Sequence, residues 1–308
     1  MNILISGSLA FDRIMDFSGK FADHILPEKI HIINVCFLVN GVDEKFGGTA
    51  GNIAYNLALL GETPTILSAV GRDFAPYEER LTSLGLPLAG LRRIDSELTA
   101  GAYITTDESN NQITGFNPGA MRHRAEYSLD GLDSNTTLAI IAPGNVDDMV
   151  GLAADYRQKN IPYIFDPGQQ ITALTGDQLL AALTGATVLV SNDYELELIS
   201  SATGHDHDSL LSRVGAIITT FGEKGSRVVD STGATDIPAV PVDHAKDPTG
   251  AGDAFRAGLI KGMVDGKCLA DAATLGSTCA AFCVEHHGTQ EHTFDQETFL
   301  ARYQASFA

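Results

Sequence analysis

The sequence predicts a doubly wound α/β fold, in which helices flank a mostly parallel β-sheet, with a small β-sheet lid. Three observations support this prediction. Beyond residue 120, short β-branched segments alternate with helical ones, which is typical of strand–helix–strand units in a parallel sheet. Between residues 14 and 119, two stretches are β-branched and lack a helical period. Glycine turns and polar residues follow the ends of predicted strands, where open α/β sheets bind ligands.

The bulk composition is that of a soluble globular protein. A chain of 308 residues, 44% of them apolar, can bury the core of one large domain with a small appendage. The net charge of −19 argues against nucleic acid as a partner, since such binding needs Lys and Arg to neutralise phosphates. The N-terminus lacks the basic segment of a signal peptide, no stretch approaches a membrane span, and the four cysteines are scattered. We therefore expect a cytoplasmic protein with no membrane partner.

The large domain is predicted to comprise residues 1–13, 47–97 and 120–308. It begins with the apolar run Ile3 to Ser6, a central strand that ends at Gly7. The other predicted strands are Thr65 to Val70, Leu138 to Ala142, Tyr163 to Asp166, Val188 to Ser191 and Ala216 to Thr220, followed by a ribbon over Ser226 to Asp230 and Thr235 to Ile237. The predicted helices include one that opens at Gly47 to Gly51, then Pro76 to Leu84, Asp147 to Lys159, Gly176 to Leu183 and Asp193 to Ala202.

Residues 14–46 and 98–119 are predicted to form the β-lid. Ile30 to Val39 is rich in β-branched residues, which favours a strand. Ala102 to Thr106 and Gln112 to Phe116 are two further strands, separated by a turn cluster. We interpret these pieces as a small sheet that stands off the large domain.

The stretch Asp247 to Asp253 has the features of a loop that becomes an anion-binding helix. Thr249 is a suitable N-cap, and apolar residues recur at helical spacing from Phe255 until Gly266 ends the run. A glycine turn that opens a helix presents free backbone N–H groups, and the helix dipole favours an anion in front of them. Gly250, Ala251 and Gly252 are therefore the predicted anion hole.

Asp253 adds a carboxylate to this anion hole, where a pure anion site would avoid one. A carboxylate in this place is suited to take a proton from a hydroxyl that attacks a phosphoryl group, while the N–H groups hold the transferred oxygens. The alternative is a glycine-rich connector whose acid caps the helix. A dinucleotide fingerprint is excluded because Phe255 stands where glycine is required, and the chain has no P-loop motif.

Four motifs occur in the order found in one known family. Asp247 to Asp253 is similar to the C-terminal signature of the ribokinase-like family, the PfkB carbohydrate kinases and adenosine kinases. Gly47 to Asn52 resembles its G-G-x-x-x-N signature, Asn192 to Glu195 its N-x-x-E motif, and Thr220 to Gly225 its T-x-G-x-x-G turn. The resemblance covers nearly the whole chain. It implies a ribokinase-like fold with a lid over the substrate, and transfer of the γ-phosphate of ATP to a hydroxyl.

The resemblance implies roles for residues in the acceptor site. Asp253 would be the base, and Asp12, just past the first strand, would hold two sugar hydroxyls beside Gly47, Gly48 and Asn52. A solvated turn aspartate is the alternative for Asp12, and close helix packing is the alternative for the two glycines. By excluding water, a lid would limit wasteful hydrolysis of ATP.

The resemblance also implies ATP and Mg²⁺ as cofactors, with a monovalent cation as a further candidate. Asn192 and Glu195 would organise Mg²⁺, largely through water, although an N-cap with a first-turn glutamate explains them too and both can hold. Thr220, Gly222, Lys224 and Gly225 would contact ATP. Lys224 and Arg256 are candidate phosphate neutralisers, with surface charge as the commoner role. Some family members carry a basic residue near the phosphates where this chain has Gly168, so that contact must be replaced or absent.

The acceptor is predicted to be the 5′-hydroxyl of a nucleoside, adenosine foremost. Ile30 to Val39 and Asn111 to Met121 look more like the lid segments of bacterial and archaeal nucleoside kinases than those of ribokinase. A purine needs an apolar, partly aromatic slot, which Phe37, Phe116 and Met121 could supply, with packing of the lid itself as the alternative role for these residues. The alternatives are a kinase of ribose- or fructose-like sugars and a ligand-binding regulator without catalysis. The protein is predicted to act as a monomer or homodimer on a small-molecule substrate and ATP.

A second cluster, near the C-terminus, invites a metal interpretation. Cys279, Cys283, His286 and His287 lie close in sequence, but apolar residues surround the two cysteines, which favours buried helix packing over structural zinc. Gly204 to Asp208 is interpreted as a solvated loop.

Overall fold

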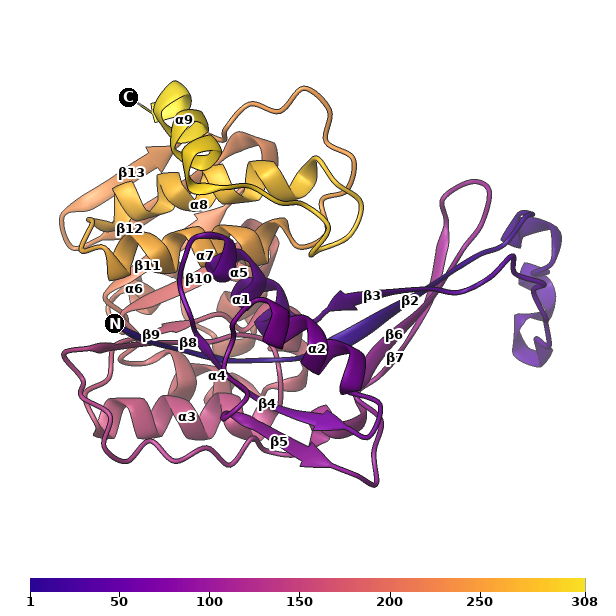
Figure 1. The fold of residues 1–308 in the computed structure, drawn as a ribbon, viewed down its shortest axis with the longest axis horizontal. Coiled ribbons are helices and arrows are strands. Elements are labelled where there is room, and N and C mark those ends of the chain that lie inside the picture. Colours follow the sequence, from indigo (N-terminus) through magenta and orange to yellow (C-terminus); the bar gives the residue numbers. More distant parts are fainter. Residues whose placement is uncertain (308) are drawn as a thin grey trace.

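The main β-sheet organises the computed structural model, which describes residues 1–307. Within this range the sheet has nine strands in the order β13-β12-β11-β10-β9-β8-β1-β4-β5 (Figure 1). The strands from β11 to β5 are parallel, whereas β12 and β13 form an antiparallel ribbon at one edge. Their bounds are β1 Asn2–Ser6, β4 Thr65–Gly71, β5 Leu91–Ile94, β8 Thr137–Ile141, β9 Tyr163–Phe165, β10 Val188–Asn192, β11 Ala216–Thr220, β12 Ser226–Asp230 and β13 Gly233–Ile237. The predicted mostly parallel sheet is confirmed.

Helices cover both faces of this sheet. One face carries α1 Thr49–Leu59, α2 Ala75–Ser83, α7 Ala251–Val264 and α8 Leu269–Val284, with α9 Gln296–Phe307 packed on α8. The other face carries α3 Val146–Gln158, α4 Gly176–Leu183, α5 Asp193–Thr203 and α6 His207–Leu211. The doubly wound arrangement predicted from the alternating pattern is therefore present.

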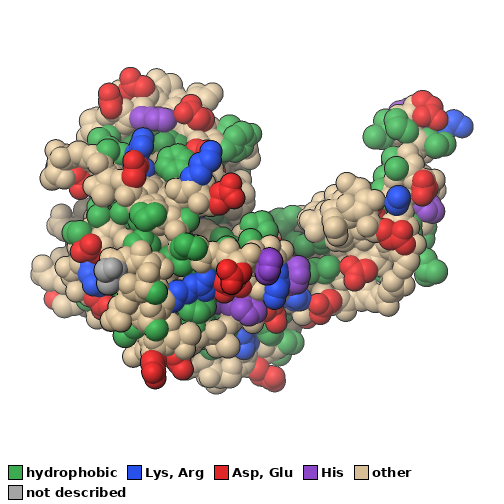
Figure 2. Space-filling model, turned by 90° about the horizontal axis from the view of Figure 1, so that it is seen from above, with side chains coloured by type: hydrophobic (Ala, Val, Ile, Leu, Met, Phe, Trp, Pro, Cys, Tyr) green, Lys and Arg blue, Asp and Glu red, His purple; other side chains and the backbone are tan. Residues whose placement is uncertain are grey.

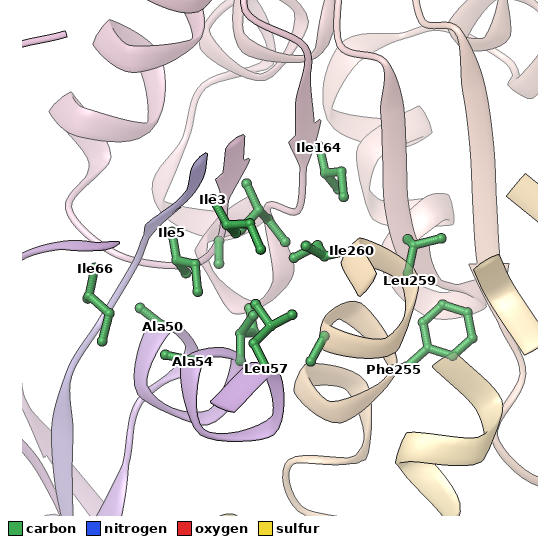
Figure 3. Close-up of a cluster of buried hydrophobic side chains, with 14 of the residues drawn as sticks. Ile3, Ile5, Ala50, Ala54, Leu57, Ile66, Ile164, Phe255, Leu259 and Ile260 are labelled. Atoms are coloured by element: carbon green, nitrogen blue, oxygen red, sulfur yellow. The ribbon is translucent and has the colours of Figure 1, made fainter. Parts of the chain in front are cut away.

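The main sheet has a hydrophobic core on each face, because side chains alternate between the two faces along each strand. In β1, Ile3 and Ile5 join the core under α1 and α7, whereas Leu4 joins the core under α3 and α4. Figure 3 shows Ile3 and Ile5 close to Leu57 of α1 and Ile260 of α7. Each such aliphatic side chain contributes about 1.5–3 kcal/mol when buried, so both helix layers hold the strand ends firmly in place.

The lid is a second sheet of four strands in the order β3-β2-β6-β7. Its strands are β2 Ala10–Asp16, β3 Asp43–Gly47, β6 Ala100–Thr106 and β7 Gln112–Asn117. It projects from the main body as an arm (Figure 1), and the space-filling view shows a hollow beside it (Figure 2). Because β2 starts at Ala10, this sheet begins ahead of the predicted lid boundary at residue 14.

The predicted strand over Ile30 to Val39 is wrong. Pro27–Ile32 forms a 3-10 helix, and the chain that follows is irregular until Val39, which makes an isolated bridge to Phe17. A β-branched segment forms a strand only where a sheet offers it an edge. Beside β2, the places are taken by β3 over Ala10 to Ile14 and by β6 over Ala10 to Asp16, and this segment lies beyond the end of β3 (Figure 1). This segment therefore forms the tip of the lid, where Ile32 and Leu38 are exposed.

The start of α7, the loop before α6 and the two cysteines of α8 bear on three further predictions. Thr249 is not the N-cap of α7, because its own N–H donates to Asp247 Oδ1 and the cap position falls on Gly250. The predicted loop Gly204 to Asp208 is also partly wrong, since α6 begins at His207. Cys279 and Cys283 are buried in α8, as the packing interpretation predicts, and no helix within residues 1–307 has the length and hydropathy of a membrane span.

Candidate functional site

A cavity of about 1300 Å³ opens at the carboxyl edge of the main sheet, facing the lid. The loops after β1, β9, β10 and β11 and the first turns of α1, α5 and α7 line it, and Asp12 and Phe116 reach it from the lid. Figure 2 shows the hollow between the main body and the arm. Residues from all four sequence motifs meet here, namely Gly48, Asn52, Asn192, Glu195, Thr220, Gly222, Gly225, Gly250, Ala251, Gly252 and Asp253.

Asp253 lies in the first turn of α7, at the wall of this cavity. Its Oδ2 accepts a hydrogen bond from Asn52 Nδ2 at 2.8 Å. Burial raises the pKa of this carboxyl to about 6; Arg256 and the bond from Asn52 oppose the rise, and Asp166 and Glu195 add to it. A carboxylate with such a pKa is mostly ionised at neutral pH, yet it accepts a proton more readily than an exposed aspartate does.

The glycine turn before Asp253 has a backbone that few other residues adopt. Gly250 has a φ of 81°, and a Cβ there would meet Thr289 Cγ2 at 2.9 Å. The N–H of Ala254 donates to the carbonyl of Gly250 at 2.9 Å and closes the first helical turn. The N–H groups of Gly252 and Asp253 precede that bond and have no acceptor inside the helix. With the dipole of α7 behind them, they suit an anion.

Asp12 lies on β2, where burial raises the pKa of its carboxyl to about 6. A Cβ on Gly47 would come within 2.5 Å of Asp12 Oδ2, and a Cβ on Gly48 within 2.6 Å of the carbonyl of Ser8. The two glycines thus allow close approach of β2 and of the loop after β1, and not of another helix as the packing alternative predicts. Gly48 also lines the cavity, whereas Gly47 does not.

Asn192 and Glu195 form a capping box at the start of α5. Asn192 Oδ1 accepts from the N–H of Glu195 at 2.7 Å, and Glu195 Oε2 accepts from the N–H of Asn192 at 2.9 Å. The cap uses one oxygen of the carboxylate, so the other can accept from water on a bound cation. Oxygen donors of this kind fit Mg²⁺, which keeps several waters and needs few protein ligands.

The turn after β11 contributes backbone more than charge to the cavity. Thr220, Gly222 and Gly225 line it, but Lys224 is exposed outside it. Gly225 has a φ of 91°, and a Cβ there would meet the carbonyl of Ile237 at 2.1 Å. The structure therefore brings three of the four predicted ATP contacts into the cavity and leaves Lys224 at the surface.

Arg256 is not a surface residue but a buried one, which the sequence alone did not reveal. Its guanidinium makes two contacts to the carboxylate of Asp166, one of them from Nη2 to Oδ1 at 2.7 Å. Its Nη1 lies against Gly252, where a Cβ would come within 2.7 Å. Among the residues that line the cavity, Arg256 is the one cationic side chain, beside the carboxylates Asp12, Asp166, Asp193, Glu195, Glu223 and Asp253.

The apolar side of the cavity differs from the predicted slot at one position. Phe116 of β7 and Met121 line the cavity, and Phe116 is 52% exposed. Phe37 does not line it. Its ring packs at the tip of the lid against Phe17 and Phe21, with centroid separations of 4.9 and 5.0 Å. Phe37 followed from the expectation of a lid strand, so its displacement has the same cause as the error over Ile30 to Val39.

Comparison with known proteins identifies the family. The sequence pattern of the pfkB family carbohydrate kinases matches residues 17–296. The chain belongs to this family. It is accordingly a phosphotransferase with an alcohol group as acceptor.

Several relatives of this chain carry a more specific name. The nucleoside kinase of Methanocaldococcus jannaschii is 34% identical over 265 residues, which cover 85% of this chain and 87% of the relative. The solved structure of Burkholderia thailandensis nucleoside kinase with inosine is 40% identical, covers 99% of this chain and 98% of its own, and has a TM-score of 0.87. The same enzyme with ADP-inosine has a TM-score of 0.85, covering 99% of this chain and 96% of its own. These likenesses confirm the ribokinase-like fold.

Proposed function

We propose that the protein is an ATP-dependent nucleoside kinase that phosphorylates the 5′-hydroxyl of its substrate, with adenosine as the preferred acceptor. The observation that carries this proposal is one cavity that holds both the Asp253 carboxylate at an anion-binding helix end and the lid aromatic Phe116. The first feature suits phosphoryl transfer to a hydroxyl. The second suits a nucleobase.

Asp253 acts as the general base in this proposal. Its carboxylate takes the proton of the acceptor hydroxyl as the hydroxyl oxygen forms a bond to the γ-phosphorus of ATP. The bond from that phosphorus to the β,γ-bridging oxygen breaks, and ADP leaves with the electron pair. The N–H groups of Gly250 and Gly252, joined by that of Asp253, stabilise the equatorial oxygens of the transferred group, whereas the N–H of Ala251 already donates to the carbonyl of Pro248 at 3.2 Å. Support comes from the pKa of Asp253, raised to about 6 by burial.

The phosphates of ATP need positive charge in a cavity where carboxylates dominate. We assign this role to Arg256, whose Nη1 lies against Gly252 of the anion hole while Asp166 holds the rest of the guanidinium. Arg256 thereby replaces the basic residue that this chain lacks at Gly168. Mg²⁺, held through water by Asn192 and Glu195, would neutralise further phosphate charge. A monovalent cation remains part of the proposal as an activator of the same site.

The acceptor lies between the lid and α1. Asp12 accepts hydrogen bonds from two ribose hydroxyls, and Asn52 can offer its second amide N–H while the first holds Asp253. Phe116 and Met121 contact the base, and closure of the lid would bring Phe116 down over it. The names of the relatives, and the inosine bound to one of them, support a nucleoside as acceptor.

A sugar kinase is the second candidate, because the same carboxylates could hold a free sugar. The apolar side chains Phe116 and Met121 count against it, since a free sugar needs polar partners all round its ring. A regulator without catalysis is disfavoured by a complete base and anion hole, and by membership of a kinase family.

Side-by-side kinetics test the proposal. We expect ADP release with MgATP to show a kcat/KM for adenosine above that for inosine and cytidine, and well above that for ribose or fructose. A preference for a free sugar would contradict the nucleoside assignment and leave the kinase intact. No turnover with any hydroxyl acceptor would contradict both.

A further inference from the structure

Gln290 is a buried polar residue in the segment between α8 and α9 that the proposed mechanism does not use. It is 3% exposed. Its Nε2 donates to Asn52 Oδ1 at 3.1 Å and to Tyr77 Oη at 2.8 Å. One side-chain amide therefore joins α1, which carries Asn52, to α2, which carries Tyr77.

The direction of these hydrogen bonds is fixed at one end by the backbone. The hydroxyl of Tyr77 donates to the carbonyl of Gly47 at 2.8 Å, and a carbonyl can only accept. Having given its proton to Gly47, Tyr77 can only accept from Gln290. The group of Gln290 that faces Tyr77 must then be its NH₂, and the same NH₂ reaches Asn52.

The orientation of Asn52 follows from this chain. Since Gln290 donates to Asn52, the oxygen of the Asn52 amide faces Gln290 and its NH₂ faces the other way. That NH₂ donates to Asp253 Oδ2 at 2.8 Å. A reversed Asn52 would set its carbonyl oxygen against a carboxylate and remove the donor, which is unfavourable for two acceptors in a buried place.

We propose that Gln290 is a positioning residue for Asp253: by donating to Asn52, it selects the amide orientation that gives the carboxylate of Asp253 a hydrogen-bond donor. This inference rests on the proposed role of Asp253 as the base. In this role Gln290 sets the position of the carboxylate that receives the proton, and it contacts neither substrate.

Several charged or titratable groups surround Asp253 and bear on a test by pH. Arg256 on the same helix favours its ionised form, and Asp166 after β9 and Glu195 on α5 disfavour it. Tyr77 on α2 and Cys283 on α8 also face it, and burial raises the pKa of both groups, so neither titrates near neutral pH. Burial also raises the pKa of Asp12 to about 6, but the test uses saturating nucleoside, which covers Asp12 and so keeps its titration out of the profile.

The test is the pH dependence of kcat/KM for MgATP at saturating nucleoside, in the full-length protein. Gln290→Met removes the donor without adding charge, and Gln290→Glu replaces the donor by an acceptor of the same shape. Without the donor at position 290, Asn52 is no longer held with its NH₂ towards Asp253. Loss of that NH₂ donor favours the protonated form of Asp253, so the acidic limb of the kcat/KM profile moves to higher pH. We expect a shift of about one pH unit with Gln290→Met and at least as much with Gln290→Glu.

The matched control is Tyr156→Phe. Tyr156 is fully buried on α3, on the opposite face of the sheet, and its hydroxyl has no hydrogen-bond partner within the described residues. We expect this variant to leave the limb where it is. Thermal melting verifies that each variant is folded, and the second substitution at position 290 serves if the first does not fold.

The outcomes separate this inference from the proposed function. A folded Gln290→Met whose acidic limb coincides with that of the unchanged protein overturns the positioning role. A shift with Gln290→Glu alone also overturns it, because charge then explains the result. Full turnover by Asp253→Asn would instead contradict the proposed base, whatever the behaviour of Gln290.

Discussion

The two walls of the cavity are built in different ways. On the side of the large domain, Asn52, Asp166 and Arg256 are buried and Asp253 is half-buried. They are tied to one another, Asp253 to Asn52 and Arg256 to Asp166. On the side of the lid, the aromatic ring of Phe116 is 52% exposed, and the tip beyond it leaves apolar side chains in solvent (Figure 2). One wall is preorganised and the other is open.

This difference suggests a division of labour. Charges that are fixed before the reaction need no reorganisation during it, which favours catalysis. A wall that closes over the acceptor after binding can be selective without holding the reacting groups. We therefore expect substitutions in the large domain to act mainly on kcat and substitutions in the lid mainly on the KM for the acceptor.

The largest expected effect is that of Asp253→Asn, which should lower kcat by roughly two orders of magnitude or more, because the variant has no carboxylate at the helix end to take the proton. The amide can still accept from Asn52, so the fold and the binding of adenosine should persist. Steady-state kinetics with calorimetric binding check this. Near-full turnover would show that Asp253 is not the base.

The second effect is that of Arg256→Met, for which we expect a loss of about tenfold to a hundredfold in kcat/KM for MgATP. It also leaves Asp166 buried without its partner, at a cost of about 3–5 kcal/mol in the free energy of unfolding. The double variant Asp166→Leu with Arg256→Met should recover stability but not activity. Recovery of both would make the pair purely structural.

The third effect is that of Asp12→Ala on the lid side. Removal of an ionised acceptor for two hydroxyls should raise the KM for adenosine by about tenfold to a hundredfold, because hydrogen bonds to charged groups contribute about 1.5–3 kcal/mol. The KM for MgATP should change little. Kinetics with each substrate varied in turn measure both values, and an equal rise in the two would indicate general damage.

The fourth effect is that of Phe116→Ala, which should raise the KM for adenosine by about fivefold to tenfold while leaving kcat close to normal. The matched control is Ile113→Ala on the same strand. Ile113 is 44% exposed and, three residues away, lies on the opposite face of β7. If both variants raise the KM equally, the effect comes from the lid as a whole and not from contact with a base.

The smallest effect is on stability. Burial raises the pKa of Asp253 from 3.8 to about 6, so the folded state holds this proton more tightly than the unfolded state does. The free energy of unfolding therefore falls as pH rises from about 4 to about 6, and stays lower above that range. Asp253→Asn should remove this loss and gain about 1–2 kcal/mol at pH 7. Urea unfolding at pH 4 and pH 7 measures the difference; an equal gain at both would contradict the assignment.

The sequence predicted the large domain well and the lid poorly, for a physical reason. The strand Val188–Asn192 is buried on both faces and reads as a continuous apolar run, and the helix Gly176–Leu183 buries only Leu179, Ala182 and Leu183, so the apolar pattern of each matches its surroundings. The segment Ile30 to Val39 has the composition of a strand but pairs with the lid only through the bridge of Val39 to Phe17, and composition does not report whether a segment reaches a partner.

At the candidate site, the sequence predicted which residues meet but not how they are held together. Gly250 and Asp253 stand in one motif, so their proximity is local. The pair of Arg256 with Asp166 joins positions 90 residues apart, and the bond from Gln290 to Asn52 joins positions 238 apart. Such contacts have no periodic signal. The absence of a basic residue at Gly168 was the one indication in the sequence that Arg256 neutralises phosphate charge in its place.

The most direct test of the central claim, that the half-buried carboxylate of Asp253 is the base, is a pH profile. We would measure kcat/KM for MgATP at saturating adenosine from pH 5 to pH 8, with the unchanged protein and with Asp253→Asn. We expect kcat/KM to fall below about pH 6, where Asp253 becomes protonated, and we expect this acidic limb to be missing from the residual activity of the variant. A flat profile for the unchanged protein, or the same limb in both proteins, would contradict it.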